Sequence, residues 1–121
     1  MKFVTLFAVL AATVLISSPA FAGTLNGKKL FNDPQFAGST NSKSCNTCHP
    51  DGSGVEKAAG KTSFTIMGHK KNSLEDTVNL CISMALKGKP IATGSGEMKD
   101  IVSYIKSLKG KKIKKRIIKG C

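Results

Sequence analysis

The sequence of 121 residues predicts an all-α fold, on three observations. Two stretches in its second half repeat apolar residues at three- and four-residue intervals behind a serine, which is the pattern of a capped amphipathic helix. A shorter apolar stretch near residue 30 stops just before a proline, as helices do. No strand-like alternation of comparable length is present. The length allows one small domain and excludes a multi-domain enzyme.

The first expected helix covers residues 25–32, with Leu30 and Phe31 facing inward. It should end at Asp33, because the residue before a proline avoids helical backbone angles. Residues 35–62 are rich in Gly, Ser, Asn, Lys and Pro. Their apolar residues repeat neither every two residues, as in a strand, nor every 3.6 residues, as in a helix, so this segment is expected to be mostly loop. A loop of this length in a small domain usually binds something.

Two further helices are expected after the loop. Ser73 should cap the second helix, and its inward stripe comprises Leu74, Val78, Cys81, Ile82 and Ala85. Gly88 and Pro90 should terminate it. Ser95 should cap the third helix, whose inward stripe comprises Met98, Ile101, Val102, Ile105 and Leu108.

The chain begins with the order of features found in secretory signals. Lys2 precedes an apolar run over residues 3–16, and the small-residue exit Ala20-Phe21-Ala22 follows. The run is shorter than the roughly 20 apolar residues that a membrane span needs. We therefore expect cleavage after Ala22 and export to an oxidising space, the periplasm. The expected divisions are a signal peptide at 1–22, one domain at 23–109 and a basic tail at 110–121.

Residues 45–49 form a C-x-x-C-H motif, which is typical of covalent haem attachment. Two thiols on one helical turn can add to the two vinyl groups of one porphyrin, and the next side chain places an imidazole beside the iron. We expect one covalently bound haem c, tethered by Cys45 and Cys48, with His49 as the proximal iron ligand. A small chain with six Phe, one Tyr and no Trp usually needs such a stabilising group.

Three other interpretations of the motif compete with haem attachment. A thioredoxin-like C-x-x-C should follow a strand, whereas this one lies in a polar loop. Zinc could bind Cys45, Cys48 and His49 together with His69 or Cys81, although a second ligand pair of the usual spacing is missing. A Cys45–Cys48 disulfide would leave the histidine unexplained.

The sixth iron ligand has several candidates, and its identity would set the chemistry. A thioether raises the reduction potential of the iron, whereas a thiolate lowers it. Cys81, Met84 and Met98 are the leading candidates, while Met67 and His69 lie in a polar loop where a surface position is the default.

Several segments together resemble a class I cytochrome c, and more narrowly the haem domains of thiosulfate dehydrogenases and of the A subunit of the sulfur-oxidation cytochrome complex. They are the C-x-x-C-H site, residues 74–79, the run CISMALKGKP at 81–90, Ser95, Glu97-Met98 and residues 101–108. The resemblance covers residues 25–109. It implies a cytochrome c fold of three to four helices wrapped around one haem, with the first and last helices crossing near Leu30, Phe31 and Tyr104.

In those families a cysteine placed like Cys81 ligates the iron, and nearby basic residues assist catalysis on sulfur compounds. The families usually act with a second haem domain or partner subunit, whereas this chain has a single C-x-x-C-H. Its fourth cysteine, Cys121, also suggests a Cys81–Cys121 disulfide in an oxidising compartment. Such a bridge would leave Met98 or Met84 as the ligand.

The end of the chain is strongly basic. Lys106, Lys109, Lys111, Lys112, Lys114, Lys115, Arg116 and Lys119 are interrupted by Ile113, Ile117 and Ile118. This segment could guide acidic redox partners or anionic sulfur compounds, could simply be solvated, or could contact an anionic membrane surface. Nucleic acid is not an expected partner of an exported protein.

Together these features favour a periplasmic monohaem cytochrome c that carries one electron between redox proteins with acidic surfaces and is not itself an enzyme. Two alternatives are kept: a haem subunit of a sulfur-compound-oxidising enzyme, and a zinc-stabilised binding module.

Overall fold

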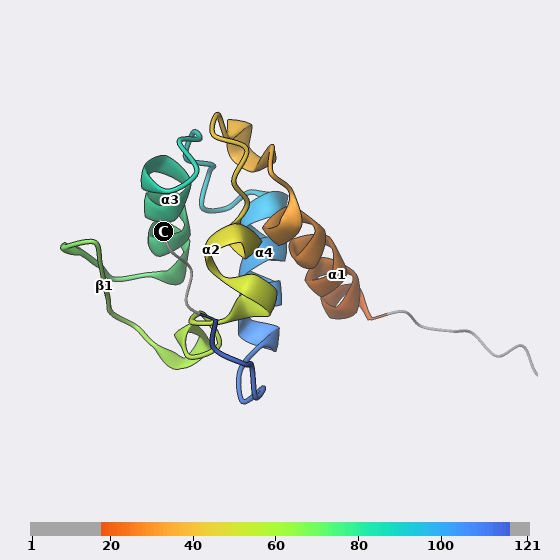
Figure 1. The fold of residues 1–121 in the computed structure, drawn as a ribbon. Helices are drawn as coiled ribbons and strands as arrows, with labels where there is room; N and C mark the ends of the chain where they lie inside the picture. Colours follow the sequence, from red (N-terminus) through yellow and green to blue (C-terminus); the bar gives the residue numbers. More distant parts are fainter. Residues whose placement is uncertain (1–17, 117–121) are drawn as a thin grey trace, which may run out of the picture.

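The structure, a computed structural model, describes residues 18–116 (Figure 1). Residues 1–17 of the expected leader, and Cys121, lie outside the described residues. The α-helices of the described part are α1 (Pro19–Asn32), α2 (Cys45–Cys48), α3 (Leu74–Met84) and α4 (Gly96–Ser107). Three short 3-10 turns lie at Phe36–Gly38, Pro50–Gly52 and Ala58–Gly60. None of these described helices is long and apolar enough to cross a membrane.

Two short strands correct the expectation of an all-α fold. Strand β1 (Phe64–Ile66) pairs antiparallel with β2 (His69–Lys71), so the described part is about half helical with one small sheet. The hairpin turns through Met67 and Gly68 at φ of 51° and 79°, the two positive angles of a tight hairpin turn. Three-residue strands are too short to show an alternating pattern, so the sequence does not predict them.

Helices α1 and α4 cross in close contact, as the resemblance implied. A Cβ atom at Gly27 would collide with the backbone of Asp100, so the glycine permits the approach of the two backbones. Beside it, the rings of Phe31 and Tyr104 meet edge to face, with centroids 5.1 Å apart. Leu30 packs against the same core. The expected crossing is therefore confirmed.

Helix α1 has the predicted end but begins earlier than predicted. The helix ends at Asn32 before Asp33-Pro34, as predicted. It begins at Pro19 and not at residue 25, since proline suits the first turn of a helix. The expected cleavage point after Ala22 therefore lies within the described helix.

The two later helices have the predicted caps. The Ser73 hydroxyl accepts a hydrogen bond from the Asp76 amide at 3.1 Å, and the Ser95 hydroxyl accepts one from the Met98 amide at 3.2 Å. The predicted stripe of α4 is buried throughout, and in α3 Leu74, Val78 and Ile82 are buried.

Helix α3 ends at Met84, earlier than Gly88 and Pro90 suggested. Lys87 adopts a left-handed φ of 54°, and the Gly88 amide donates to the Ile82 carbonyl at 3.0 Å. The last turn of the helix is closed by the Ala85 and Leu86 amides, which donate to the Cys81 carbonyl at 2.8 and 3.2 Å.

Candidate cofactor site

The two cysteines of the C-x-x-C-H motif occupy a single helical turn. The preceding Ser44 amide donates to the Thr47 hydroxyl at 3.0 Å, and the His49 amide donates to the Cys45 carbonyl at 2.9 Å. These bonds form the short helix α2 and place Cys45 and Cys48 one helical turn apart. Double attachment to one porphyrin needs this spacing.

The His49 ring is oriented by a hydrogen bond. Its Nδ1 atom lies 2.9 Å from the Ser53 carbonyl oxygen. Because a carbonyl oxygen only accepts, Nδ1 carries a hydrogen, and in the neutral ring Nε2 then keeps its free electron pair. A second bond of this kind is how metal-binding histidines are usually fixed.

The turn after His49 depends on residues with left-handed backbone. Asp51, Gly52 and Gly54 have φ of 53°, 86° and 89°. A Cβ at Gly54 would lie 3.4 Å from the His49 Nδ1. The chain therefore curls closely around one edge of the imidazole and brings the Ser53 carbonyl to it.

Sequence-distant hydrogen bonds join the segment that leads into α2 to the end of α3. Ser39 Oγ donates to the Leu86 carbonyl at 3.0 Å and Thr40 Oγ1 to the Lys87 carbonyl at 3.0 Å. Asn41 Nδ2 donates to the Ala85 carbonyl at 2.7 Å. We call these the 39–41 bridge. It holds the approach to the motif against the helix that carries Cys81.

The thiols of Cys45 and Cys81 lie within electrostatic reach of each other. Burial, together with the neighbouring Cys81, raises the pKa of Cys45 to about 12. Burial also raises the pKa of Cys81 above its ordinary value. In the absence of a cation, both sulfurs are therefore held as neutral thiols at pH 7.

The other candidate ligands of the iron differ in how deeply the structure buries them. Met98 is fully buried in the hydrophobic core, with no exposed surface. Met84 is partly exposed, one turn beyond Cys81 along α3, whereas Met67 is half exposed at the hairpin tip. His69 lies exposed on β2. Cys81 is therefore the candidate that the structure associates with the motif.

The cysteine states correct two of the sequence-based alternatives. Cys45 is a free thiol, so it is not bridged to Cys48. Cys81 is also free, so the suggested Cys81–Cys121 bridge is not formed. Cys48 is disulfide-bonded. A half-cystine must be reduced before its sulfur can react with another group.

The zinc and thioredoxin interpretations gain no support from the described residues. Between residues 18 and 116, no three or more His, Cys, Asp or Glu side chains gather as a metal-binding group. In the same range the motif is not preceded by a strand, since β1 begins only at Phe64.

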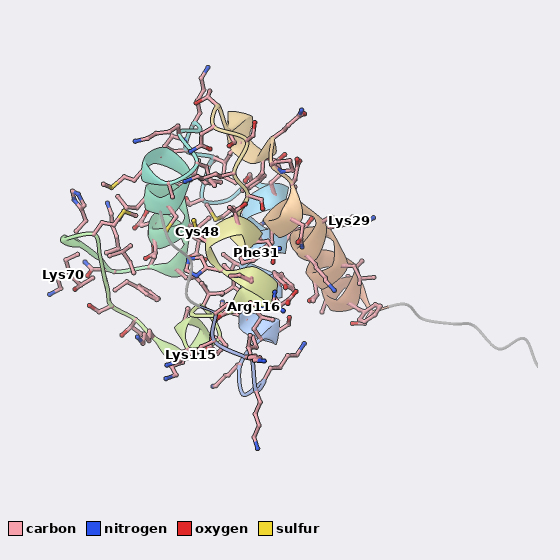
Figure 2. The ribbon with its side chains drawn as sticks, in the orientation of Figure 1. Lys29, Phe31, Cys48, Lys70, Lys115 and Arg116 are labelled. Atoms are coloured by element: carbon pink, nitrogen blue, oxygen red, sulfur yellow. The ribbon has the colours of Figure 1, made fainter. Side chains whose placement is uncertain are left out.

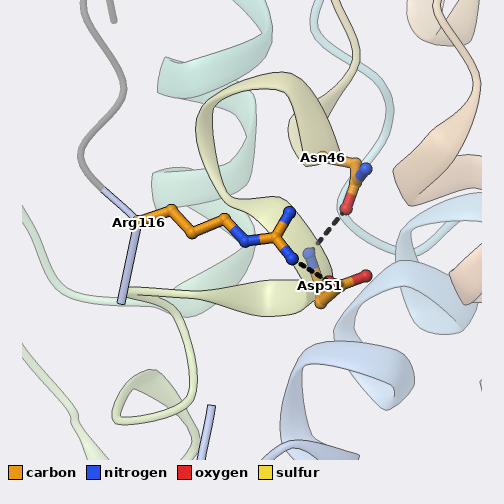
Figure 3. A network of polar contacts seen from close by, with 3 residues as sticks. All are labelled: Asn46, Asp51 and Arg116. Atoms are coloured by element: carbon orange, nitrogen blue, oxygen red, sulfur yellow. Dashed lines mark hydrogen bonds and ion pairs between the residues drawn. The ribbon is translucent and has the colours of Figure 1, made fainter. Parts of the chain in front are cut away.

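The basic tail contacts the motif segment, a feature that the sequence did not predict. An Arg116 guanidinium nitrogen lies 4.0 Å from Asp51 Oδ2, and the Asp51 amide donates to Asn46 Oδ1 at 2.8 Å (Figure 3). Ile113 packs against the core and fixes the tail on the body of the protein. Burial raises the pKa of Tyr104 on α4, and the charge of Asp51 raises it further.

Comparison with protein-family models, with curated proteins and with solved structures found no match.

Proposed function

We propose that the protein is an exported monohaem cytochrome c that carries single electrons. The observation that carries this proposal is the orientation of His49, which follows two cysteines on one helical turn and keeps Nε2 free for a metal. The cytochrome c fold is part of the proposal. It is supported by the close crossing of α1 and α4 at Gly27 and by the Phe31–Tyr104 pair.

Each residue of the motif has a distinct role in this proposal. Cys45 and Cys48 would each add sulfur and hydrogen across one vinyl double bond, which forms two thioethers without net oxidation. Cys48 must first be reduced by an external thiol. The bound haem would supply the one-electron redox chemistry. His49 would donate its Nε2 electron pair to the iron, while the Ser53 carbonyl keeps the ring in place.

We place Cys81 first as the sixth ligand, with Met84 second and Met98 third. Cys81 is the sulfur candidate that lies within electrostatic reach of Cys45, whereas Met98 already fills the core. A thiolate ligand requires the Cys81 proton to leave, and a metal cation promotes that loss. The periplasm remains the proposed compartment, and redox proteins with acidic surfaces remain the proposed partners.

The experiment is expression with the leader in a host that matures cytochromes c. We expect a red protein whose haem stays attached in acid acetone, with a pyridine haemochrome spectrum of the two-thioether type. Cys45→Ser together with Cys48→Ser should abolish attachment. The matched control, Cys81→Ser, should keep the covalent haem and change only the spectrum of the iron. A protein whose colour is removed entirely by acid acetone would refute the proposal.

The free thiol of Cys81 favours one second candidate, a haem subunit that oxidises sulfur compounds. That chemistry requires a Cys81 that is not consumed in a bridge, as observed. Steady oxidation of thiosulfate by the purified protein with an artificial electron acceptor, lost in Cys81→Ser, would establish it. Absence of thiosulfate turnover would leave electron transfer as the proposed function.

A further inference from the structure

A surface hollow of about 410 Å³ separates the first half of α1 from the chain that follows α4. Its apolar lining comes from Phe21, Leu25, Tyr104, Leu108 and Ile113. Lys28, Lys111 and Lys112 also line it. Its one acidic residue is Asp51, which pairs with Arg116. The hollow thus combines an apolar interior with an excess of positive charge.

The positive charge extends beyond the hollow, from the last turn of α4 along the described part of the tail. Lys106, Lys109, Lys111, Lys112, Lys114, Lys115 and Arg116 are all exposed. No acidic residue follows Asp100 in the sequence. Ile113 anchors this segment on the core, so its lysines are displayed by the folded body of the protein.

An exposed apolar side chain lies among these lysines. Leu25 is 47% exposed and lines the same hollow as Lys28 and Lys111. Phe21 is even more exposed, but it precedes the expected cleavage point and would be absent from the mature protein. Lysines around exposed apolar groups are typical of surfaces that lie on a lipid bilayer.

We propose that this surface, the tail–α1 face formed by Leu25, Lys28, Lys111, Lys112 and Ile113, docks on an anionic lipid bilayer. The charge is complementary to acidic headgroups, which attract clustered lysines. The apolar groups can enter the boundary between headgroups and acyl chains. An acidic protein is the less suitable occupant of this face, because lysine is depleted in protein interfaces and none of the five residues that form the face is aromatic or an arginine.

The test measures sedimentation of the purified protein with vesicles. The first vesicles contain about one third phosphatidylglycerol in phosphatidylcholine, and the second contain phosphatidylcholine alone. We expect binding to the anionic vesicles only, and weaker binding as salt rises. The triple variant Lys28→Glu, Lys111→Glu and Lys112→Glu should weaken binding about tenfold or more.

A matched control changes the same number of charges elsewhere. Lys61→Glu, Lys70→Glu and Lys71→Glu lie in or near the hairpin, and Lys70 is on the opposite side of the molecule from Lys29 of α1 (Figure 2). This control should weaken binding about threefold or less. Leu25→Ser should weaken the binding that persists at high salt, since it removes an apolar contact and no charge.

Three results would overturn the proposal. Equal loss of binding in the two triple variants would mean that net charge alone acts. Absence of binding to anionic vesicles would remove the lipid partner. Unchanged binding in Leu25→Ser, with complete displacement from vesicles by polyglutamate, would indicate an acidic polypeptide instead. Haem attachment is measured separately by absorbance, so failure of this proposal and failure of the proposed cytochrome function are distinguishable.

Discussion

His49 shows how much of the site depends on single backbone atoms. The motif predicts a histidine beside two cysteines, but only the folded turn shows that the Ser53 carbonyl selects Nε2 as the free nitrogen. The sequence could not predict this bond, because it depends on the left-handed turn through Asp51, Gly52 and Gly54 and on no particular side chain.

Gly54→Ala should disturb this turn in two ways. An alanine at φ of 89° is strained, and its Cβ would contact the His49 ring. We expect a loss of about 1–3 kcal/mol in the free energy of unfolding, measured in urea, together with a shift in the reduction potential of the haem protein. Gly38→Ala is the control, since it has a φ of 70° but open space around it. It should lose stability without moving the potential, and an equal shift in both variants would contradict the proposed contact.

Cys45 should be a poor nucleophile in folded protein that lacks haem. Burial and the neighbouring Cys81 raise its pKa to about 12, so the reactive thiolate is scarce at pH 8. We expect its alkylation by iodoacetamide to be roughly a thousandfold slower than in the urea-unfolded chain, as followed by peptide mass analysis. The folded protein should gain reactivity as pH rises toward 12, because deprotonation then becomes favourable. Equal rates in folded and unfolded chains would contradict the observed burial.

Among the elements, the two capped helices were the most predictable. Ser73 and Ser95 each precede an apolar stripe of helical spacing, and both accept the amide bonds that such caps make. The end of α3 was less predictable, because the left-handed residue that follows the helix is Lys87 and not a glycine. The hairpin was missed because its turn has no Asn-Gly or Asp-Gly signal.

Gly27→Ala should separate α1 from α4. The new methyl group would collide with the Asp100 backbone, which cannot move without shifting the helix. We expect a loss of about 2–3 kcal/mol in the free energy of unfolding, measured by urea or thermal denaturation. Gly96→Ala, where the new methyl meets nothing, should be neutral or slightly stabilising because alanine favours a helix. Similar losses in the two variants would mean that the crossing tolerates a methyl group.

At the scale of the whole molecule, Asp51 connects three parts that are distant in sequence: the motif segment, the basic tail and α4. The motif residues were predictable because they are consecutive. This connection was not, because it depends on where the chain goes after α4 ends. The contact between the tail and the motif segment is therefore seen only in the structure and could not be predicted from the sequence.

Asp51→Asn tests this connection through Tyr104, the one tyrosine of the chain. The Asp51 charge disfavours the phenolate, so its removal should lower the pKa of Tyr104. The pKa should stay above its ordinary value, because burial is the larger cause. A pH titration of phenolate absorbance measures both effects. Stability should change by less than about 1 kcal/mol, since the Asp51–Arg116 pair is largely exposed. An unchanged pKa would show that the two groups do not interact.

The 39–41 bridge has a consequence for how the protein could be divided. Its hydrogen bonds join residues before the hairpin to residues after it, and the crossing of α1 with α4 does the same. The tip between them, at Met67 and Gly68, is exposed and leaves both sets of contacts intact. We therefore expect two separately synthesised pieces, meeting at that tip, to reassemble spontaneously when mixed.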